Sequence, residues 1–189
     1  MRLILASASP RRAELLESAG YSFEVAASNV DESVEPGEEP KAYALRVARD
    51  KAQAALAHCR KSGGVVLAAD TVVVADARIL AKPESPADAK RMLKTLSGAV
   101  HEVHTAVVIQ TGDREFSDVV TSRVQLLPLS DAEIDWYVAS GEWDGKAGGY
   151  GIQGRAARFI DWLEGSWSNV VGLPVAAVYR LLKEAGETD

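Results

Sequence analysis

The chain has 189 residues, of which 47% are hydrophobic and 25% are charged, and its net charge is −6 at pH 7. This composition is typical of a globular protein, and the length predicts one domain over residues 1–189. An acidic chain lacks the basic face that duplex binding needs, so no nucleic-acid partner is expected. A single cysteine excludes a disulfide framework, and no apolar run approaches membrane-spanning length. We therefore expect a cytoplasmic protein without a membrane partner.

The first third of the chain alternates strand-like and helix-like patterns. Residues 3–7 form a continuous apolar run typical of a buried strand, and residues 9–20 predict a helix that begins at a Ser-Pro pair and ends at a glycine. Residues 21–26 alternate as a strand. An acidic loop over residues 31–40 leads into a helix over residues 41–58, where apolar residues recur with a period near 3.6.

The middle of the chain begins with a second buried-type strand over residues 65–69, which is expected to end at Asp70. Three more features are predicted after it: a hairpin of residues 71–74 and 79–81, a helix over residues 85–98, and paired antiparallel strands at residues 103–110 and 118–127. The last third contains a capping box that begins a helix over residues 130–140, a strand over residues 157–163, and a helix over residues 174–185. Strands mixed with helices predict an α/β fold with a mixed, partly antiparallel sheet flanked by helices.

A candidate phosphate site follows the first strand. Ser7, Arg11 and Arg12 lie where a strand ends and a helix begins, and the N–H groups of a helix N-terminus attract anions. Guanidinium groups bind phosphate through two parallel hydrogen bonds. The alternative is that Ser9 only caps the helix and the arginines are solvated.

Four further charged residues are candidates for chemistry. Asp70 leaves an apolar strand, which suits a general base or a metal ligand, although an aspartate that starts a turn is an equal alternative. The proline that follows Lys82 ends the strand and fixes the direction in which Lys82 leaves it. Lys51 belongs to the long predicted helix and Glu32 to the acidic loop, and for these three residues the alternative is an ordinary solvated charge.

The segment 146–154, Lys-Ala-Gly-Gly-Tyr-Gly-Ile-Gln-Gly, has four glycines in nine residues. Glycine lets a backbone pass close to a ligand and adopt positive φ. Gln153 adds an amide that offers a donor and an acceptor side by side, which can read one edge of a nucleobase. A flexible surface turn is the alternative.

Five motifs together resemble the Maf family of nucleoside triphosphate pyrophosphatases, in that family's order and over essentially the whole chain. They are residues 5–12, 69–73, 82–83, 146–154 and 165–174. The resemblance implies a fold of two lobes with a cleft between them, similar to inosine triphosphatases. It also implies hydrolysis of a nucleoside triphosphate to the monophosphate and pyrophosphate with a divalent cation (Mg²⁺, Mn²⁺ or Co²⁺).

The resemblance also assigns roles to single residues. Asp70 corresponds to the catalytic aspartate, Lys51 and Lys82 to lysines that act on the phosphates beside it, and Glu32 with Asp70 to the metal-binding acids. Whether Asp70 is the base or a metal ligand stays open. Among the substrate-binding positions, Ser7 and Arg12 correspond to phosphate-contacting groups of the family, and Arg11, Thr71 and Gln153 match the three positions that distinguish the dTTP/UTP subfamily.

The predicted activity is therefore hydrolysis of dTTP and UTP, including pyrimidine nucleotides modified at C5. Two alternatives remain. One is a nucleotide-binding regulator of cell division with little turnover, and the other is the same reaction on another base such as 7-methyl-GTP. The chain departs from the family pattern at Trp167, where tyrosine is common, and at Asp76-Ala77, where the hairpin usually has Asp-Gly. Apolar residues near Trp167 permit a homodimer.

Overall fold

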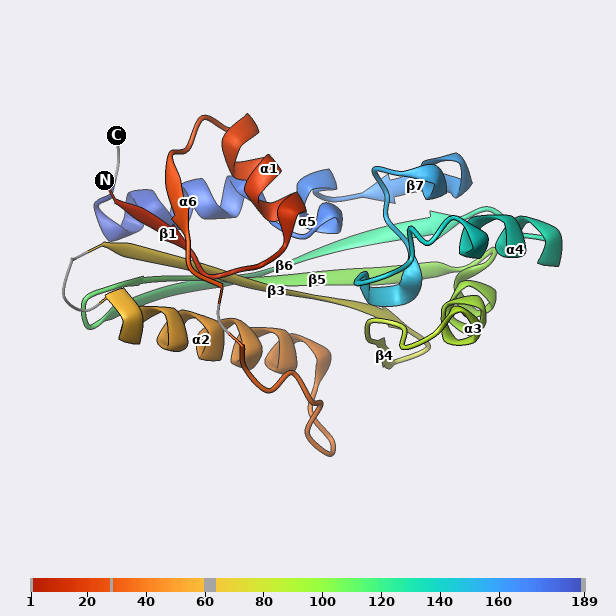
Figure 1. Ribbon diagram of the computed structural model, residues 1–189, viewed down its shortest axis with the longest axis horizontal. Helices are drawn as coiled ribbons and strands as arrows, with labels where there is room; N and C mark the ends of the chain where they lie inside the picture. Colours follow the sequence, from red (N-terminus) through yellow and green to blue (C-terminus); the bar gives the residue numbers. More distant parts are fainter. Residues whose placement is uncertain (1, 28, 60–63, 188–189) are drawn as a thin grey trace. The chain divides into compact units, whose positions relative to one another are not determined.

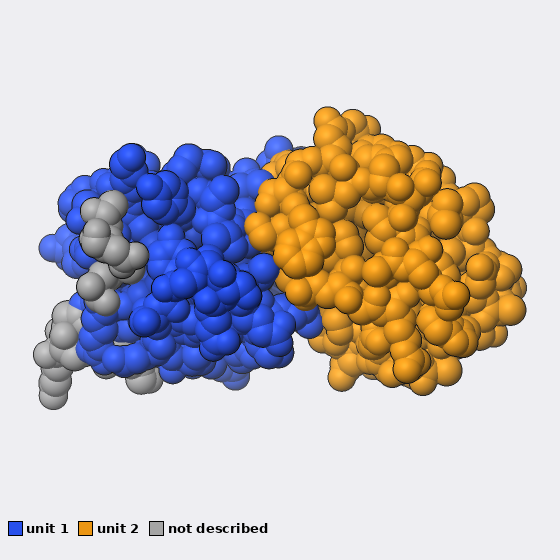
Figure 2. Space-filling view, turned by 90° about the horizontal axis from the view of Figure 1, so that it is seen from above, with its two compact units in different colours: residues 1–71, 105–120, 172–189 blue, residues 72–104, 121–171 orange. Residues whose placement is uncertain are grey.

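The structure is a computed structural model that describes residues 2–27, 29–59 and 64–187 (Figure 1). Its contacts divide the chain into two compact units (Figure 2). Unit 1 contains residues 1–71, 105–120 and 172–189, and unit 2 contains residues 72–104 and 121–171. The prediction of one domain over residues 1–189 stays a prediction.

The predicted α/β class is confirmed. The strands of the described residues form one sheet in the order β2-β1-β3-β5-β6-β7, with β4 paired to β3, and this sheet contains both parallel and antiparallel pairs. No helix in the described part of the chain is both long and apolar enough to cross a membrane. The elements are β1 (Leu3–Leu5), α1 (Pro10–Ser18), β2 (Phe23–Val25), α2 (Pro40–Cys59), β3 (Val65–Ala75), β4 (Arg78–Leu80), α3 (Pro86–Leu96), β5 (Val100–Thr111), β6 (Arg114–Leu126), α4 (Asp131–Ala139), the 3₁₀ turns η1 (Ala147–Gly149) and η2 (Arg155–Phe159), β7 (Ile160–Glu164), α5 (Trp167–Val171) and α6 (Val175–Ala185).

In unit 1, β1 lies between β2 and β3 and is parallel to both. The chain passes from β1 through α1 to β2, and then returns across β1 through α2 to β3. Because crossovers between parallel strands are right-handed, these opposite directions place α1 and α2 on opposite faces of the sheet, as Figure 1 shows. β1 ends at Leu5, which pairs with Leu67, whereas β3 continues to Ala75. β3 therefore extends past the end of β1, between the faces covered by α1 and α2.

The prediction that the second buried strand ends at Asp70 is wrong. β3 is a continuous strand of 11 residues, and Asp70 lies inside it. The strand continues because Val72, Val73 and Ala75 are buried after it, so the apolar sheet surface extends past the one carboxylate. The hairpin is confirmed, since residues 73–75 pair with residues 78–80. Asp76 and Ala77 have φ values of 49° and 57°, as both central residues of a type I′ turn require.

Unit 2 has its own apolar core, which includes Val73, Leu93, Tyr137, Tyr150 and Phe159. The strand predicted over residues 157–163 is partly wrong. The described chain forms the 3₁₀ turn η2 first, and β7 begins only at Ile160. Ala156 and Phe159 are both buried, and their spacing of three residues matches one 3₁₀ turn, so core packing favours the turn over an extended chain. The short helix α5 was not predicted.

Candidate active site

The candidate site lies at the end of β1 and consists of backbone and side chains of unit 1. The N–H group of Ala6 donates to Leu67 O at 2.8 Å, and the chain then turns away from β3 toward α1. Beside this turn β3 presents Asp70 and Thr71 in succession. Neighbouring residues of a strand face opposite sides of the sheet, so Asp70 faces α2 and Thr71 faces α1. Ligands of open α/β sheets bind at such a place, outside the carboxyl end of a strand where the connections diverge.

Arg12 connects three segments of this site. Its Nε donates to Gly172 O at 2.7 Å, Nη1 to Ser7 Oγ at 3.1 Å, and Nη2 to Thr71 Oγ1 at 3.1 Å. The residue is only 8% exposed, and burial lowers the pKa of Arg12 while the negative charges of Asp70 and Glu32 act in the opposite direction. A guanidinium has five N–H groups, so two beyond these three can serve an anionic ligand. Arg12 therefore holds these three segments together and is also a candidate phosphate ligand.

Ser7 is placed to act with Arg12. Its Oγ accepts hydrogen bonds from Arg12 Nη1 and from the N–H of Ser9 at 3.2 Å, so its own hydroxyl proton can be donated to a phosphate oxygen. Ser9 occupies the N-cap position of α1, but its side chain makes no capping hydrogen bond. The alternative in which Ser9 only caps the helix and the arginines are solvated is wrong for Arg12, which is buried. Arg11, in the first turn of α1, is half-buried.

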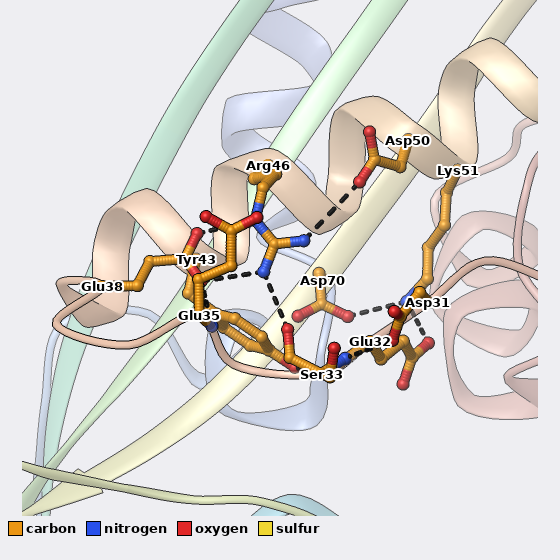
Figure 3. A network of polar contacts seen from close by, with 10 residues as sticks. All are labelled: Asp31, Glu32, Ser33, Glu35, Glu38, Tyr43, Arg46, Asp50, Lys51 and Asp70. Carbon is orange, nitrogen blue, oxygen red and sulfur yellow. Dashed lines mark hydrogen bonds and ion pairs between the residues drawn. The ribbon is translucent and has the colours of Figure 1, made fainter.

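On the α2 face, one ammonium group lies between two carboxylates. Lys51 Nζ is 2.7 Å from Asp70 Oδ1 and 2.7 Å from Glu32 Oε1 (Figure 3). Lys51 and Asp70 are 7% and 6% exposed, so the alternative of an ordinary solvated charge is wrong for Lys51. Removing ions from water costs free energy that the mutual attraction of a buried pair often fails to recover. Such a cluster, formed where α2 and the acidic loop meet β3, is therefore a candidate for chemistry.

The carboxylates of Glu32 and Asp70 suit a hard divalent cation, because Mg²⁺ is bound by one or two carboxylates together with water and substrate phosphates. No group of three or more His, Cys, Asp and Glu residues that could hold a metal ion occurs among residues 2–27, 29–59 and 64–187. The residues present thus fit a metal that shares its coordination with a phosphate.

The two remaining predicted residues, Lys82 and Gln153, belong to unit 2. The glycine loop of residues 146–154 lies against the segment that carries Lys82, because the N–H of Gly148 donates to Ala81 O at 3.2 Å. Gly148 has φ of +71°, and a Cβ there would lie 3.0 Å from a methyl carbon of Val73, so only glycine fits without a shift. The loop is anchored in unit 2 rather than a flexible surface turn.

The structure thus groups the predicted residues into two sets. Unit 1 brings six of them together around the end of β1, namely Ser7, Arg12, Glu32, Lys51, Asp70 and Thr71. Unit 2 brings the Lys82 segment beside the glycine loop. The catalytic and binding roles of all these residues stay predictions.

Sequence reasoning missed several contributors to the unit 1 site. Thr105 Oγ1 is 2.9 Å from Thr71 Oγ1 and fully buried. A polar residue inside the apolar run of residues 103–110 was a usable signal for it. Gly172 belongs to the motif of residues 165–174, but the contact of its carbonyl oxygen with Arg12 could not be inferred from that motif. Tyr43 donates its hydroxyl to Glu32 O at 2.8 Å, and burial, with the charges of Asp70 and Glu32, raises the pKa of Tyr43 to about 12.

A buried histidine anchors the glycine loop in unit 2. His101 Nε2 and the hydroxyl of Tyr150 are 2.6 Å apart, and the two rings meet edge to face. The N–H of Gly151 donates to the hydroxyl of Tyr137 at 3.2 Å. Burial lowers the pKa of His101 to about 4. The imidazole is therefore neutral in the folded protein near neutral pH.

This histidine is expected to make the fold sensitive to mild acid. Between an unfolded pKa near 6.5 and the folded pKa of about 4, only the unfolded chain binds the proton of His101, so stability falls as the pH falls through this window. Relative to His101→Asn, the wild type is expected to lose about 2–3 kcal/mol more unfolding free energy between about pH 7 and about pH 4.5. Urea denaturation of both proteins at the two pH values measures the difference. Equal losses would show that His101 titrates normally.

The mixed sheet, with a buried cation–carboxylate cluster between β3 and α2, defines an α/β protein with a candidate enzyme site. The family of Maf-like proteins matches residues 2–185, and the chain belongs to this family. It is 50% identical over 190 residues to a protein of Anaeromyxobacter sp. (strain Fw109-5) named dTTP/UTP pyrophosphatase, with 98% of this chain and 90% of that protein covered. A protein of the same name from Koribacter versatilis (strain Ellin345) is 50% identical over 186 residues, with 98% and 95% covered. The Ham1 protein of Staphylococcus aureus, a solved structure, is 14% identical with a TM-score of 0.46, over 69% of this chain and 73% of that one.

Proposed function

We propose that the chain hydrolyses dTTP and UTP, including pyrimidine nucleotides modified at C5, to the nucleoside monophosphate and pyrophosphate. The names of its relatives support this activity. The observation that carries the proposal is the buried contact between Asp70 and Lys51, close to the buried guanidinium of Arg12. A protein that only binds a triphosphate needs cations, whereas a carboxylate among them repels the ligand. Its presence favours a reaction in which a proton is removed from water.

In this reaction a water oxygen attacks the α-phosphorus, and the bond to the bridging oxygen of pyrophosphate breaks. Asp70 accepts the proton of the attacking water as general base; in the alternative that stays open, it would instead help to hold the cation. Arg12, with Ser7, binds phosphate oxygens, and Lys51 neutralises charge that develops on the leaving pyrophosphate. The new monophosphate keeps the water oxygen, and pyrophosphate leaves with the electron pair of the broken bond.

Glu32 and Asp70 would hold the divalent cation in this proposal. When bound, it supplies Lewis-acid polarisation of a phosphoryl oxygen and lowers the pKa of a coordinated water. The ammonium group of Lys51 already occupies one oxygen of each carboxylate, which keeps the two side chains directed at one place.

The sequence motifs are the basis for assigning substrate selection. Gln153 is assigned to recognise the base, and it acts together with Arg11 and Thr71 to select the subfamily's substrates. Uracil and thymine present an N–H donor between carbonyl acceptors, and an amide complements part of that edge. Gln153 is exposed in the structure. Cytosine lacks this N–H and would leave the amide partner unsatisfied, which can lower turnover by a factor on the order of 10⁴ where the bound nucleotide excludes water. Lys82 is assigned to the phosphates.

The cytoplasmic location and a homodimer near Trp167, which is 48% exposed, also stay predictions.

The test is incubation of the purified protein with Mg²⁺ and, in separate reactions, dTTP, UTP, CTP and 7-methyl-GTP. We expect dTMP or UMP with equimolar pyrophosphate, and far slower turnover of CTP. Release of dTDP and phosphate would contradict the cleavage position. Faster hydrolysis of 7-methyl-GTP would favour the alternative base, and binding of dTTP without turnover would favour the regulator.

A further inference from the structure

The acidic loop that carries Glu32 contains no helix or strand, yet a single arginine of α2 binds it at several points. Arg46 Nε donates to Glu38 Oε1 at 2.7 Å, and Nη2 donates to Glu38 Oε2 at 2.8 Å (Figure 3). Two parallel hydrogen bonds between a guanidinium and a carboxylate fix their relative orientation. Glu38 Oε2 also accepts the N–H of Glu35 at 3.1 Å, and its side chain is only 11% exposed. This geometry differs from that of a mobile surface ion pair.

The same helix face also binds the backbone at Glu32 itself. Arg46 Nη2 donates to Ser33 O at 2.9 Å, and the Tyr43 hydroxyl donates to Glu32 O at 2.8 Å, so two consecutive carbonyl groups of the loop are fixed. The guanidinium carbon of Arg46 is 5.5 Å from the centre of the Tyr43 ring. Tyr43 and Arg46 are three residues apart and therefore neighbours on α2. Further along the helix lies Lys51, whose ammonium group contacts the Glu32 carboxylate.

These contacts determine where the carboxylate of Glu32 lies. With its carbonyl oxygen bound by Tyr43 and the next carbonyl bound by Arg46, the backbone of Glu32 is fixed relative to α2, and so is the starting point of its side chain. The carboxylate then reaches the ammonium group that Asp70 also contacts. Without the hydrogen bonds from Arg46 and Tyr43, the carboxylates of the acidic loop would repel one another and the triphosphate.

We propose that Arg46, supported by Glu38 and Tyr43, is a positioning residue that fixes the acidic loop so that Glu32 meets Lys51 beside Asp70. The inference rests on the proposed function and adds a group that acts through the loop backbone. It also explains the composition of the loop: Glu38 binds Arg46, whereas Glu32 is directed at the site.

The experiment is a double-mutant cycle between Arg46→Met and Glu32→Gln, read out as pyrophosphate release from dTTP. Loss of positioning is expected to lower kcat on the order of 10-fold, because small displacements of a catalytic group have large effects on rate, and to change KM less. In the Glu32→Gln background, Arg46→Met is expected to change kcat by less than about twofold, since residues that act as one unit are not additive. Tyr43→Phe, which keeps the ring, is expected to cause a smaller loss with the same dependence on Glu32.

The matched control is Arg180→Met, which removes an arginine of α6 whose contact with Asp118 at 3.1 Å is likewise an ion pair but is distant in sequence from the loop. It should leave kcat unchanged. A kcat for Arg46→Met equal to that of the wild type would overturn the proposal, and so would an equal fold-loss with and without Glu32, which indicates a general effect on folding.

Hydrogen exchange of the peptide over residues 29–39 provides a second readout that needs no turnover. Arg46→Met should exchange faster than the wild type in this peptide and equally in β3, whereas unchanged exchange in the loop would overturn the proposal. If the wild type releases no pyrophosphate from dTTP or UTP, the proposed function fails. The exchange measurement then still decides whether Arg46 orders the loop.

Discussion

Asp70→Asn is expected to lower kcat for dTTP hydrolysis by a factor on the order of 10³, because positioned proton transfer contributes rate factors of this size. Asparagine has nearly the same shape, and its amide oxygen can accept the hydrogen bond from Lys51 that Asp70 Oδ1 accepts at 2.7 Å. It cannot take up a proton from water, and it is a weaker ligand for a divalent cation. The fold and the binding of the triphosphate are therefore expected to survive while the chemical step does not.

The measurements are single-turnover kinetics and equilibrium titration with dTTP, since KM equals a dissociation constant only when chemistry is slow. The control is Asp76→Asn, the same change at an exposed turn position with φ of 49°, which asparagine tolerates. Asp70→Asn with wild-type turnover would remove this carboxylate from the mechanism. A parallel loss of turnover and of dTTP affinity would assign it to binding instead.

The parts of the fold that could be predicted carry local signals. Ser85 caps α3 by accepting the N–H of Asp88 at 3.2 Å, and Ser130 with Glu133 forms the capping box of α4. Both signals lie within four consecutive residues, so a sequence contains all the information that the local structure uses. The hairpin turn at Asp76-Ala77 was predictable for the same reason, although it lacks the usual glycine.

The errors arise where tertiary packing decides. Asp70 resembles a strand end because a carboxylate is rare inside an apolar strand. In the structure a lysine from α2, 19 residues earlier, compensates the charge, and the strand continues. Sequence periodicity identifies α2 and β3 but does not state which side chains meet across them. Lys51 and Glu32, each resembling a solvated charge, could therefore be assigned only through the family resemblance.

Arg12 illustrates a second limit of sequence reasoning. Its place after a strand predicted a phosphate ligand, and its guanidinium does lie beside the end of β1, where it binds Ser7. Three of its hydrogen bonds, however, go to Gly172, Ser7 and Thr71. Two of these partners are distant in the sequence, so no local pattern indicates that the residue also connects the segments around the site.

Lys51→Met is expected to have the largest combined effect on stability and activity. The substitution removes the ammonium group between Asp70 and Glu32 and leaves the buried Asp70 without its partner. Loss of one member of a buried ion pair destabilises a protein by about 3–5 kcal/mol, because the remaining charge is uncompensated. Turnover is expected to fall by a factor on the order of 10²–10³, as for removal of one group that stabilises transition-state charge. Urea denaturation and pyrophosphate release measure the two effects separately.

Two comparisons separate the structural part of this effect from the chemical part. Lys41→Met removes an exposed lysine of the same helix and is expected to change the unfolding free energy by less than about 0.5 kcal/mol. The double variant Lys51→Met, Asp70→Asn removes the uncompensated charge as well. It is expected to be more stable than Lys51→Met alone, because a buried pair is costly mainly when only one partner is removed. Its turnover stays low, since the group that acts on the attacking water and the group that acts on the phosphates are both gone. If the double variant were instead less stable than Lys51→Met by the full cost of Asp70→Asn, Lys51 and Asp70 would contribute independently, and the cluster would not act as one charged unit.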